Sequence, residues 1–190
     1  YGPRFAELHA CLAGLAEFHG TAYLDLIRSY TTDQRARIQA AAYAAWARLA
    51  PQEKDLIAER LLASEHRRVR RLFGVLSSKL GAYVQRETAL PLMLAHGDYG
   101  QMLALVKGEP WALLEVVAMT AAMTRSDPNF RSRLHEELCL WMASAVRGYT
   151  QPTEQQRAFL RQQTVQQALF ELLEGDPPRQ AYLKHELSAL

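Results

Sequence analysis

The chain has 190 residues, of which 49% are hydrophobic and 22% are charged, and it contains only 10 Gly and 8 Pro. This composition is typical of a globular protein and excludes collagen-like, low-complexity and largely disordered chains. The formal net charge of +2 is too close to zero to indicate a nucleic-acid-binding protein by itself.

The apolar residues are mainly those that favour helices. There are 29 Ala and 29 Leu but only 8 Val and 3 Ile, so helix formers greatly outnumber the β-branched residues that favour strands. We therefore predict an all-α fold, a compact bundle of seven or eight helices. We expect residues 1–190 to form a single domain, in which residues 150–190 could be a C-terminal helical-hairpin appendage.

The chain opens with two predicted helices. Apolar residues recur at alternating spacings of three and four from Phe5 to Leu26, which predicts a helix over residues 4–30. Capping residues at positions 31–33 then predict the start of a second helix, which ends near Leu49.

A third helix is expected to follow from Pro51, because a proline in the first turn loses no intrahelical hydrogen bond. This helix could continue as far as Glu87, with Gly74 and Gly81 as bends. The residue before a proline disfavours helical geometry, so we expect Pro91 to break the pattern that reaches it.

Caps, prolines and glycines delimit the helices of the second half. These signals predict helices at residues 98–108, 110–125, 128–148 and 153–175, and a last one from 176 onward. Between Pro110 and Thr124 the only charged residue is Glu115. A helix that is apolar nearly all round belongs in the middle of a bundle, so we expect the other helices to pack around residues 110–125.

Local catalytic and metal-binding motifs are missing from the sequence. It contains no glycine-rich nucleotide-binding loop, no G-x-S-x-G, no H-E-x-x-H and no C-x-x-C. Sites assembled from scattered residues are not excluded by this observation. We nevertheless expect no metal or other cofactor, and we favour a protein that is not an enzyme.

Cysteine content and amino-acid usage favour a bacterial cytoplasm. Cys11 and Cys139 lie too far apart to build a disulfide framework, so we expect two reduced thiols. Arg outnumbers Lys by 18 to 4, which together with the excess of Ala and Leu is typical of a GC-rich bacterial genome. No apolar stretch reaches the roughly 18 residues of a membrane span, and we expect no membrane partner.

Three residues form a candidate pocket: His19, His66 and Glu115. Both histidines fall on apolar stripes of predicted helices, where imidazoles could bind a metal or haem. The commoner case is a buried neutral His that is hydrogen-bonded to a carbonyl. Glu115, alone on its apolar helix, could anchor a ligand if it is buried, or pair with an Arg at the surface.

The segment SSKLGA at residues 77–82 resembles the glycine-containing distal helix of bacterial haem oxygenases, which also place a ligating His in an early helix. The resemblance covers six residues and would give His19 the ligating role. The segment follows His19 more closely than the layout of that family implies. Haem binding is therefore kept as an alternative function.

The densest basic cluster of the chain comprises Arg67, Arg68, Arg70 and Arg71. On a helix, three of them point away from the apolar stripe and Arg70 lies at its flank. Such a face could bind an acidic partner through forked hydrogen bonds, or be simply solvated. No other stretch is as basic, so nucleic acid is not an expected partner. Leu183 and Leu187 form an apolar stripe that docks either on the protein's own core or on a second chain.

The turn around His96, Asp98 and Tyr99 is a candidate loop site, because it brings an imidazole, a carboxylate and a phenol within four residues. A structural interpretation is also available, since Gly97 could end one helix and Asp98 could cap the next. In that case the Asp98→Ala substitution should cost about 1 kcal/mol of stability.

The first functional hypothesis is a non-catalytic helical interaction or regulatory protein, an adaptor or modulator that docks on another protein or on a second copy of itself. The first alternative is a helical ligand-binding or haem-binding protein, or an enzyme, with a buried pocket. The second alternative is the ligand-sensing part of a transcription regulator.

Overall fold

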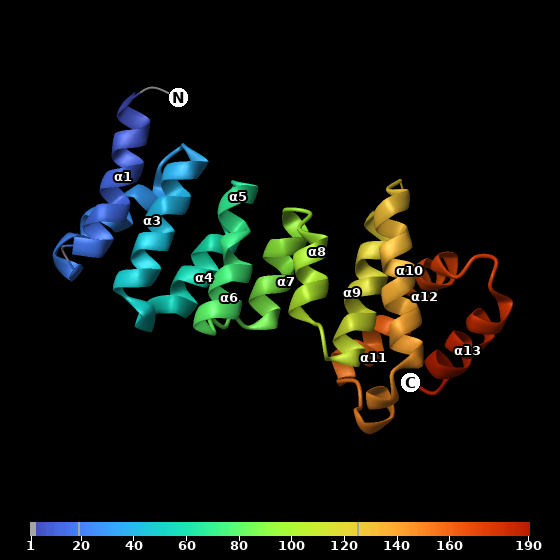
Figure 1. The fold of residues 1–190 in the computed structure, drawn as a ribbon. Coiled ribbons are helices and arrows are strands. Elements are labelled where there is room, and N and C mark those ends of the chain that lie inside the picture. The colour runs from blue at the N-terminus through green and yellow to red at the C-terminus, as the bar shows by residue number, and fades with distance from the viewer. Residues whose placement is uncertain (1–2, 19, 125) are drawn as a thin grey trace. The chain divides into compact units, whose positions relative to one another are not determined.

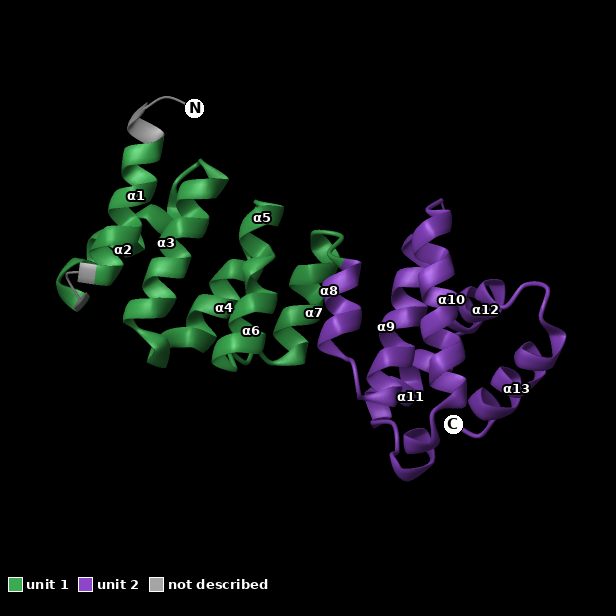
Figure 2. Ribbon diagram, in the orientation of Figure 1, with its two compact units in different colours: residues 1–98 green, residues 99–190 purple. Residues whose placement is uncertain are grey.

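A computed structural model of the protein describes residues 3–18, 20–124 and 126–190 (Figure 1). Every regular element in these residues is helical, and none of them forms a strand, which confirms the predicted all-α class. The chain divides into two compact units, residues 1–98 and residues 99–190 (Figure 2). The expectation of a single domain over residues 1–190 stays a prediction.

Unit 1 is a row of helices that pack mainly on their neighbours in the chain (Figure 2). Helix α3 contacts α1 and α2 as well as α4, α5 and α6, and α4 in turn contacts α6 and α7. The α-helices are α1 (Pro3–Phe18), α2 (Leu24–Ser29), α3 (Ala36–Leu49), α4 (Lys54–Leu62), α5 (Arg67–Arg70), α6 (Leu72–Leu80) and α7 (Arg86–Ala95). Short 3-10 helices lie at η1 (Gly20–Tyr23), η2 (Tyr30–Thr32) and η3 (Pro51–Glu53).

The core of unit 1 forms where α3, α4 and α5 meet. Trp46, Ile57, Leu61 and Val69 are essentially inaccessible to solvent, and burial of such apolar side chains favours folding. These helices all belong to unit 1, and the predicted single bundle around residues 110–125 is not confirmed.

The helices of unit 1 are shorter than the sequence predicts. The expected helix over residues 4–30 ends at Phe18 and is followed by the 3-10 helix that starts at Gly20. Glycine weakens a helix by about 1 kcal/mol relative to alanine, which favours a break at this point. The prediction that His19 lies on the apolar stripe of this helix concerns a residue outside the described ones.

The expected helix over residues 51–87 is interrupted between α4 and α5. At this turn, side chains form hydrogen bonds with the backbone N–H and C=O groups. The Ser64 hydroxyl accepts from the N–H of His66 at 3.2 Å, and the Arg70 guanidinium donates to the Ser64 and Glu65 carbonyls at 2.8 and 3.0 Å. Such local bonds compete with helical ones. Gly81 then ends α6 with a φ of 60°, a conformation that favours glycine.

The prediction that Pro91 breaks the chain's helical pattern is wrong, since Pro91 lies inside α7. A proline removes one hydrogen bond to the carbonyl four residues earlier. Both Pro91 and Glu87 are exposed. Water can therefore hydrogen-bond to the Glu87 carbonyl, which receives no N–H from the proline.

Unit 2 is built around the apolar helix predicted from the sequence. Its helices are α8 (Tyr99–Leu105), α9 (Pro110–Met123), α10 (Pro128–Ala143), α11 (Glu154–Leu160), α12 (Gln163–Leu172), α13 (Pro177–Ser188) and the 3-10 helix η4 (Ala145–Tyr149). Helix α9 contacts α8, α10, α11, α12 and η4. The central position of α9 is thus a property of unit 2.

The expected helix over residues 153–175 is two helices, α11 and α12. The side-chain amide of Gln166 donates to the carbonyl of Leu160 at 3.0 Å, so it occupies an acceptor at the end of α11. Gln162 has an extended backbone and precedes α12 directly. The expected helix over residues 128–148 ends as an α-helix at Ala143 and continues, after one residue, as η4.

The predicted helix starts of unit 2 are confirmed at three sites. The carboxylates of Asp127 and Asp176 accept from the backbone N–H three residues later, at 3.0 and 3.2 Å. Thr153 and Gln156 form a complete capping box. These bonds satisfy N–H groups that have no partner within their helix.

The capping box of α11 gives a stability prediction. The Thr153→Ala substitution should lower the free energy of unfolding of unit 2 by about 1 kcal/mol, because the first turn of α11 loses its side-chain acceptor. Urea unfolding followed by circular dichroism measures this change. The matched Gln155→Ala substitution, at an exposed position of the same turn, should have less than half that effect.

Candidate functional site

The clearest candidate site is a groove of about 680 Å³ in unit 1, between α3 and α6. We call it the α3–α6 groove. Its walls are mostly apolar, and two cationic side chains belong to its lining. The lining residues are Tyr43, Ala44, Ala47, Arg48, Pro51, Leu72, Val75, Leu76, Lys79 and Leu80.

Helical spacing explains why these residues share one groove. The α6 residues lie at positions 72, 75, 76, 79 and 80, which form a single stripe along one helix face. The facing positions of α3 include Ala44 and Ala47, whose single methyl groups leave space in front of the bulkier α6 side chains. Val75 and Leu80 are 46% and 38% exposed, so apolar surface is left open to solvent.

The electrostatics of the groove are cationic. Arg48 and Lys79 are both exposed, and no carboxylate occurs among the described residues of the lining. Arg48 approaches Glu17 of α1 at 3.8 Å, but each of these side chains is 62% exposed. An ion pair so open to water contributes little, so the Arg48 charge is available to another anionic group.

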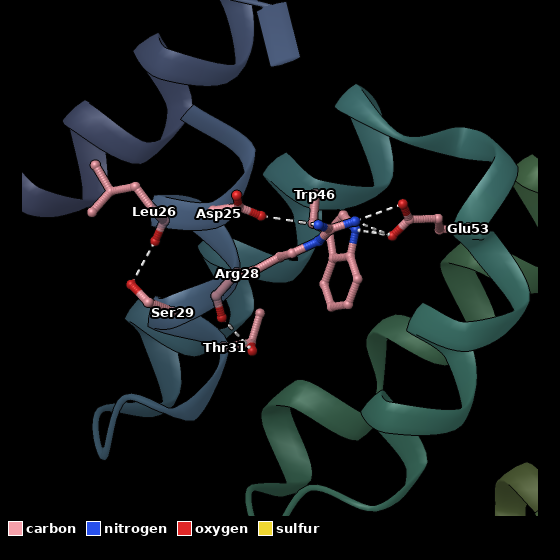
Figure 3. A network of polar contacts seen from close by, with 7 residues as sticks. All are labelled: Asp25, Leu26, Arg28, Ser29, Thr31, Trp46 and Glu53. Carbon is pink, nitrogen blue, oxygen red and sulfur yellow. Dashed lines mark hydrogen bonds and ion pairs between the residues drawn. The ribbon is translucent and has the colours of Figure 1, made fainter. Parts of the chain in front are cut away.

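The wall formed by α3 is anchored by four residues that we call the Trp46 cluster: Arg28, Trp46, Glu53 and Arg60. Trp46 is 1% exposed, and its indole N–H donates to Glu53 at 2.8 Å. The guanidinium carbons of Arg28 and Arg60 each lie 5.2 Å from the centre of the Trp46 ring. One nitrogen of Arg28 also donates to both carboxylate oxygens of Glu53 at 2.6 Å (Figure 3).

This cluster fixes the groove wall because its residues come from four different elements, α2, α3, η3 and α4. The ring of Tyr43, which lines the groove, is stacked on Trp46 with centroids 6.1 Å apart. Burial raises the pKa of Tyr43, so its neutral form is favoured. The groove wall and the Trp46 cluster are therefore one packed unit.

The basic cluster predicted from the sequence is split by the structure. Arg67, Arg68 and Arg71 are exposed, whereas Arg70 is 4% exposed. Arg70 forms a buried ion pair with Asp98, in addition to its bonds to the turn at Ser64 and Glu65. Arg70 is therefore a structural residue that joins α5 to the end of α7, and its expected place on a binding face is corrected.

The candidate loop site is corrected for the same reason. Asp98 is 6% exposed and its carboxylate is committed to Arg70. His96 directly follows α7 and is half-buried, and Gly97 next to it has a φ of 68°. Tyr99 belongs to unit 2, where its ring contacts that of Phe130 at 5.6 Å.

The candidate pocket residues have local roles in the described part of the chain. His66 precedes α5, is half-buried and donates its backbone N–H to Ser64. Glu115 accepts from the side-chain amide of Gln156 at 3.2 Å. His19 lies outside the described residues. His66 belongs to unit 1 and Glu115 to unit 2, and a pocket that they share stays a prediction.

The apolar stripe of the last helix is covered by unit 2 itself. Leu183 and Leu187 are 0% and 4% exposed, which corrects their expected role as contact residues for a partner. Arg147 holds α13 in place, since its guanidinium lies 4.6 Å from the Trp141 ring centre and 5.3 Å from that of Tyr182.

Other site types have no support in the part of the chain that the structure describes. No group of three or more His, Cys, Asp or Glu side chains is arranged to hold a metal ion there. None of its helices is both long and apolar enough to cross a membrane. The segment at residues 77–82 is the end of α6 together with its left-handed glycine, so it is not a continuous helix. No protein-family model, curated protein or solved structure matches the chain.

Sequence reasoning missed the α3–α6 groove for a definite reason. The spacing of Leu76, Leu80 and Tyr83 puts them on one apolar stripe of a helix but does not show whether that stripe is covered, and Leu80 and Tyr83 are 38% and 69% exposed. The available signal was the apolar residues Leu72 and Val75 at the flank of that stripe. They make α6 apolar over more of its circumference than a single contact requires.

The buried ion pair between Arg70 and Asp98 predicts a larger loss of stability than the loss of a helix cap would cause. The Asp98→Ala substitution should destabilise unit 1 by about 3–5 kcal/mol, because it leaves the Arg70 charge buried without its partner. Chemical unfolding measures the loss. The Arg70→Met substitution added to Asp98→Ala should recover much of this stability, and a loss near 1 kcal/mol for Asp98→Ala would indicate only a cap.

The Trp46 cluster gives a pH prediction. The hydrogen bonds from Arg28 and then Trp46 lower the pKa of Glu53. Its stabilising effect is therefore complete above the ordinary carboxyl pKa of about 4.5 and is lost as the pH falls through the lowered value. The Glu53→Gln variant should be less stable than the wild type at pH 7. The stabilities of the two proteins should become similar once the pH falls below the lowered pKa of Glu53.

Thermal unfolding between pH 3 and pH 7 tests the role of Glu53. The exposed Glu59 on α4 provides the matched control, and Glu59→Gln should follow the wild-type profile. Parallel profiles for wild type and Glu53→Gln would contradict the prediction.

Proposed function

We propose that this protein is a non-catalytic interaction protein, an adaptor or modulator, that binds a helix of another protein in the α3–α6 groove. The observation that supports this proposal is the open apolar face formed by Val75 and Leu80 on one wall of the groove. Exposed apolar patches with polar rims mark interaction sites. Two parallel rows of side chains suit a helix that inserts apolar residues at spacings of three and four.

The dimensions of the groove support a short contact. The α6 stripe extends from Leu72 to Leu80, about 12 Å along a helix axis. A partner helix of two to three turns would cover it. Each Val or Leu that becomes fully buried contributes about 1.5–3 kcal/mol, so a few inserted side chains give useful but reversible affinity. This is the expected behaviour of a modulator, which we place in a bacterial cytoplasm.

A small amphiphile is the second candidate occupant. The groove volume of about 680 Å³ lies within the range of small-molecule sites, roughly 300–1,000 Å³. Its apolar walls and two cations would suit an acyl chain with an anionic head group. The exposure of Val75 and Leu80 favours the helix, because a small ligand is generally enclosed to a greater extent.

Native mass spectrometry tests the proposed function with two matched variants. Val75→Gln changes the exposed groove wall, and Leu140→Gln changes an equally apolar position on α10 that is 64% exposed. Protein purified from its natural cells should carry a second chain in the wild type and in Leu140→Gln. The Val75→Gln variant should not carry this second chain, because it should bind the chain at least tenfold more weakly.

Other masses found in this experiment would identify a different occupant of the groove or contradict the proposal. A dimer that Val75→Gln abolishes would show that the occupant is a second copy of this chain. An added few hundred daltons that depend on Val75 would favour the amphiphile. Bare monomer in all three proteins, or a partner that survives Val75→Gln, would contradict the proposed function.

A further inference from the structure

The helices that form the α3–α6 groove lie in the most basic part of unit 1. Residues 35–79 contain ten Lys or Arg and four Asp or Glu, a net charge of +6, whereas the whole chain has a net charge of only +2. The excess is therefore local. It coincides with the stretch that runs from the start of α3 to the end of α6.

Part of this positive charge is paired within the protein, and part of it is exposed to solvent. Of the four carboxylates in the stretch, Glu53 is paired with Arg28, which lies outside the stretch. Of the ten cations, Arg70 is neutralised by Asp98 and Arg35 by Asp33. The side chains of Arg67, Arg68 and Arg71 remain exposed directly before α6.

The positive charge reaches the groove itself through Arg48 and Lys79. They come from opposite walls, Arg48 from α3 and Lys79 from α6, and both are exposed. A ligand in the groove therefore has a cation on each side of its apolar contact. Complementary charges at the rim of an interface raise the association rate and reject partners of the wrong sign.

We propose that the α3–α6 groove selects an acidic amphipathic helix, with Leu-like side chains between the walls and Asp or Glu side chains facing Arg48 and Lys79. This inference rests on the proposed function and adds the chemical class of the partner. A helix with Lys or Arg at the same flanking positions would place like charges together and would be rejected.

A displayed peptide library tests this selectivity. Every member carries Leu at the positions that form one helix face, and each flanking position is drawn equally from Glu, Lys, Gln and Ala. The library is selected on the wild-type protein. Clones that also bind the Val75→Gln variant are removed, and this neutral substitution introduces no charge bias. Among the clones that depend on the groove, Glu should exceed Lys at least threefold at the flanking positions.

The outcomes separate the two proposals. Clones that depend on Val75 but contain as much Lys as Glu would overturn the acidic selectivity and leave the groove as a helix-binding site. If no clone depends on Val75, both the proposed function and the selectivity are overturned.

Charge reversal provides a second measurement with a selected Glu-rich peptide. The Arg48→Glu/Lys79→Glu variant should bind this peptide at least tenfold more weakly by fluorescence anisotropy, and the difference should shrink in high salt because exposed charges are screened. The Lys184→Glu control, at an exposed position on α13, should change binding less than twofold. Equal affinities for the double variant and the control would overturn the role of the two cations.

Discussion

The packing around Trp46 is the constraint on which the first unit depends. A buried indole needs an acceptor for its N–H, and Glu53 supplies it from the short 3-10 helix between α3 and α4. The same carboxylate binds Arg28 of α2, and a second guanidinium, that of Arg60, approaches the ring from α4. Trp46 thus joins α3 to α2, η3 and α4, and Figure 3 shows how Arg28 and Glu53 meet at this ring.

The ion pair between Arg70 and Asp98 has a comparable role at the other end of unit 1. A buried charge is tolerated only when it is paired and hydrogen-bonded, and Arg70 has both a carboxylate and two backbone carbonyls as acceptors. These bonds hold the turn between α4 and α5 and join it to the last residue of the unit. Together with the Trp46 cluster they place α3 and α6 side by side, with the groove between them.

The groove is a consequence of an imbalance in side-chain size. Ala44 and Ala47 leave space on the facing surface of α3, next to Tyr43 and Arg48, while α6 presents Leu and Val over a broad face, and the space between the two helices stays partly open. The apolar area left over is available for a partner. Because the same helices carry most of the excess positive charge of unit 1, the groove combines shape with a charge preference, and both features are needed for selectivity.

The sequence alone determined the helical class and most of the helix starts in the second half. Those features depend on local chemistry: the Ala and Leu excess, the prolines at first positions, and the side-chain acceptors of Asp127, Thr153 and Asp176. It also identified the apolar helix that starts at Pro110, because an apolar circumference is a local property, but the expected bundle of all other helices around residues 110–125 is not confirmed.

Only the tertiary structure decided which charged and apolar residues are available at the surface. Arg70 and its neighbour Arg71 have the same chemistry, yet the first is buried against Asp98 and the second is exposed. Leu183 and Leu80 are equally apolar, yet the first is covered and the second is open. Periodicity shows which residues share a helix face, but burial depends on what packs against that face, and this depends on contacts between residues that are distant in the sequence.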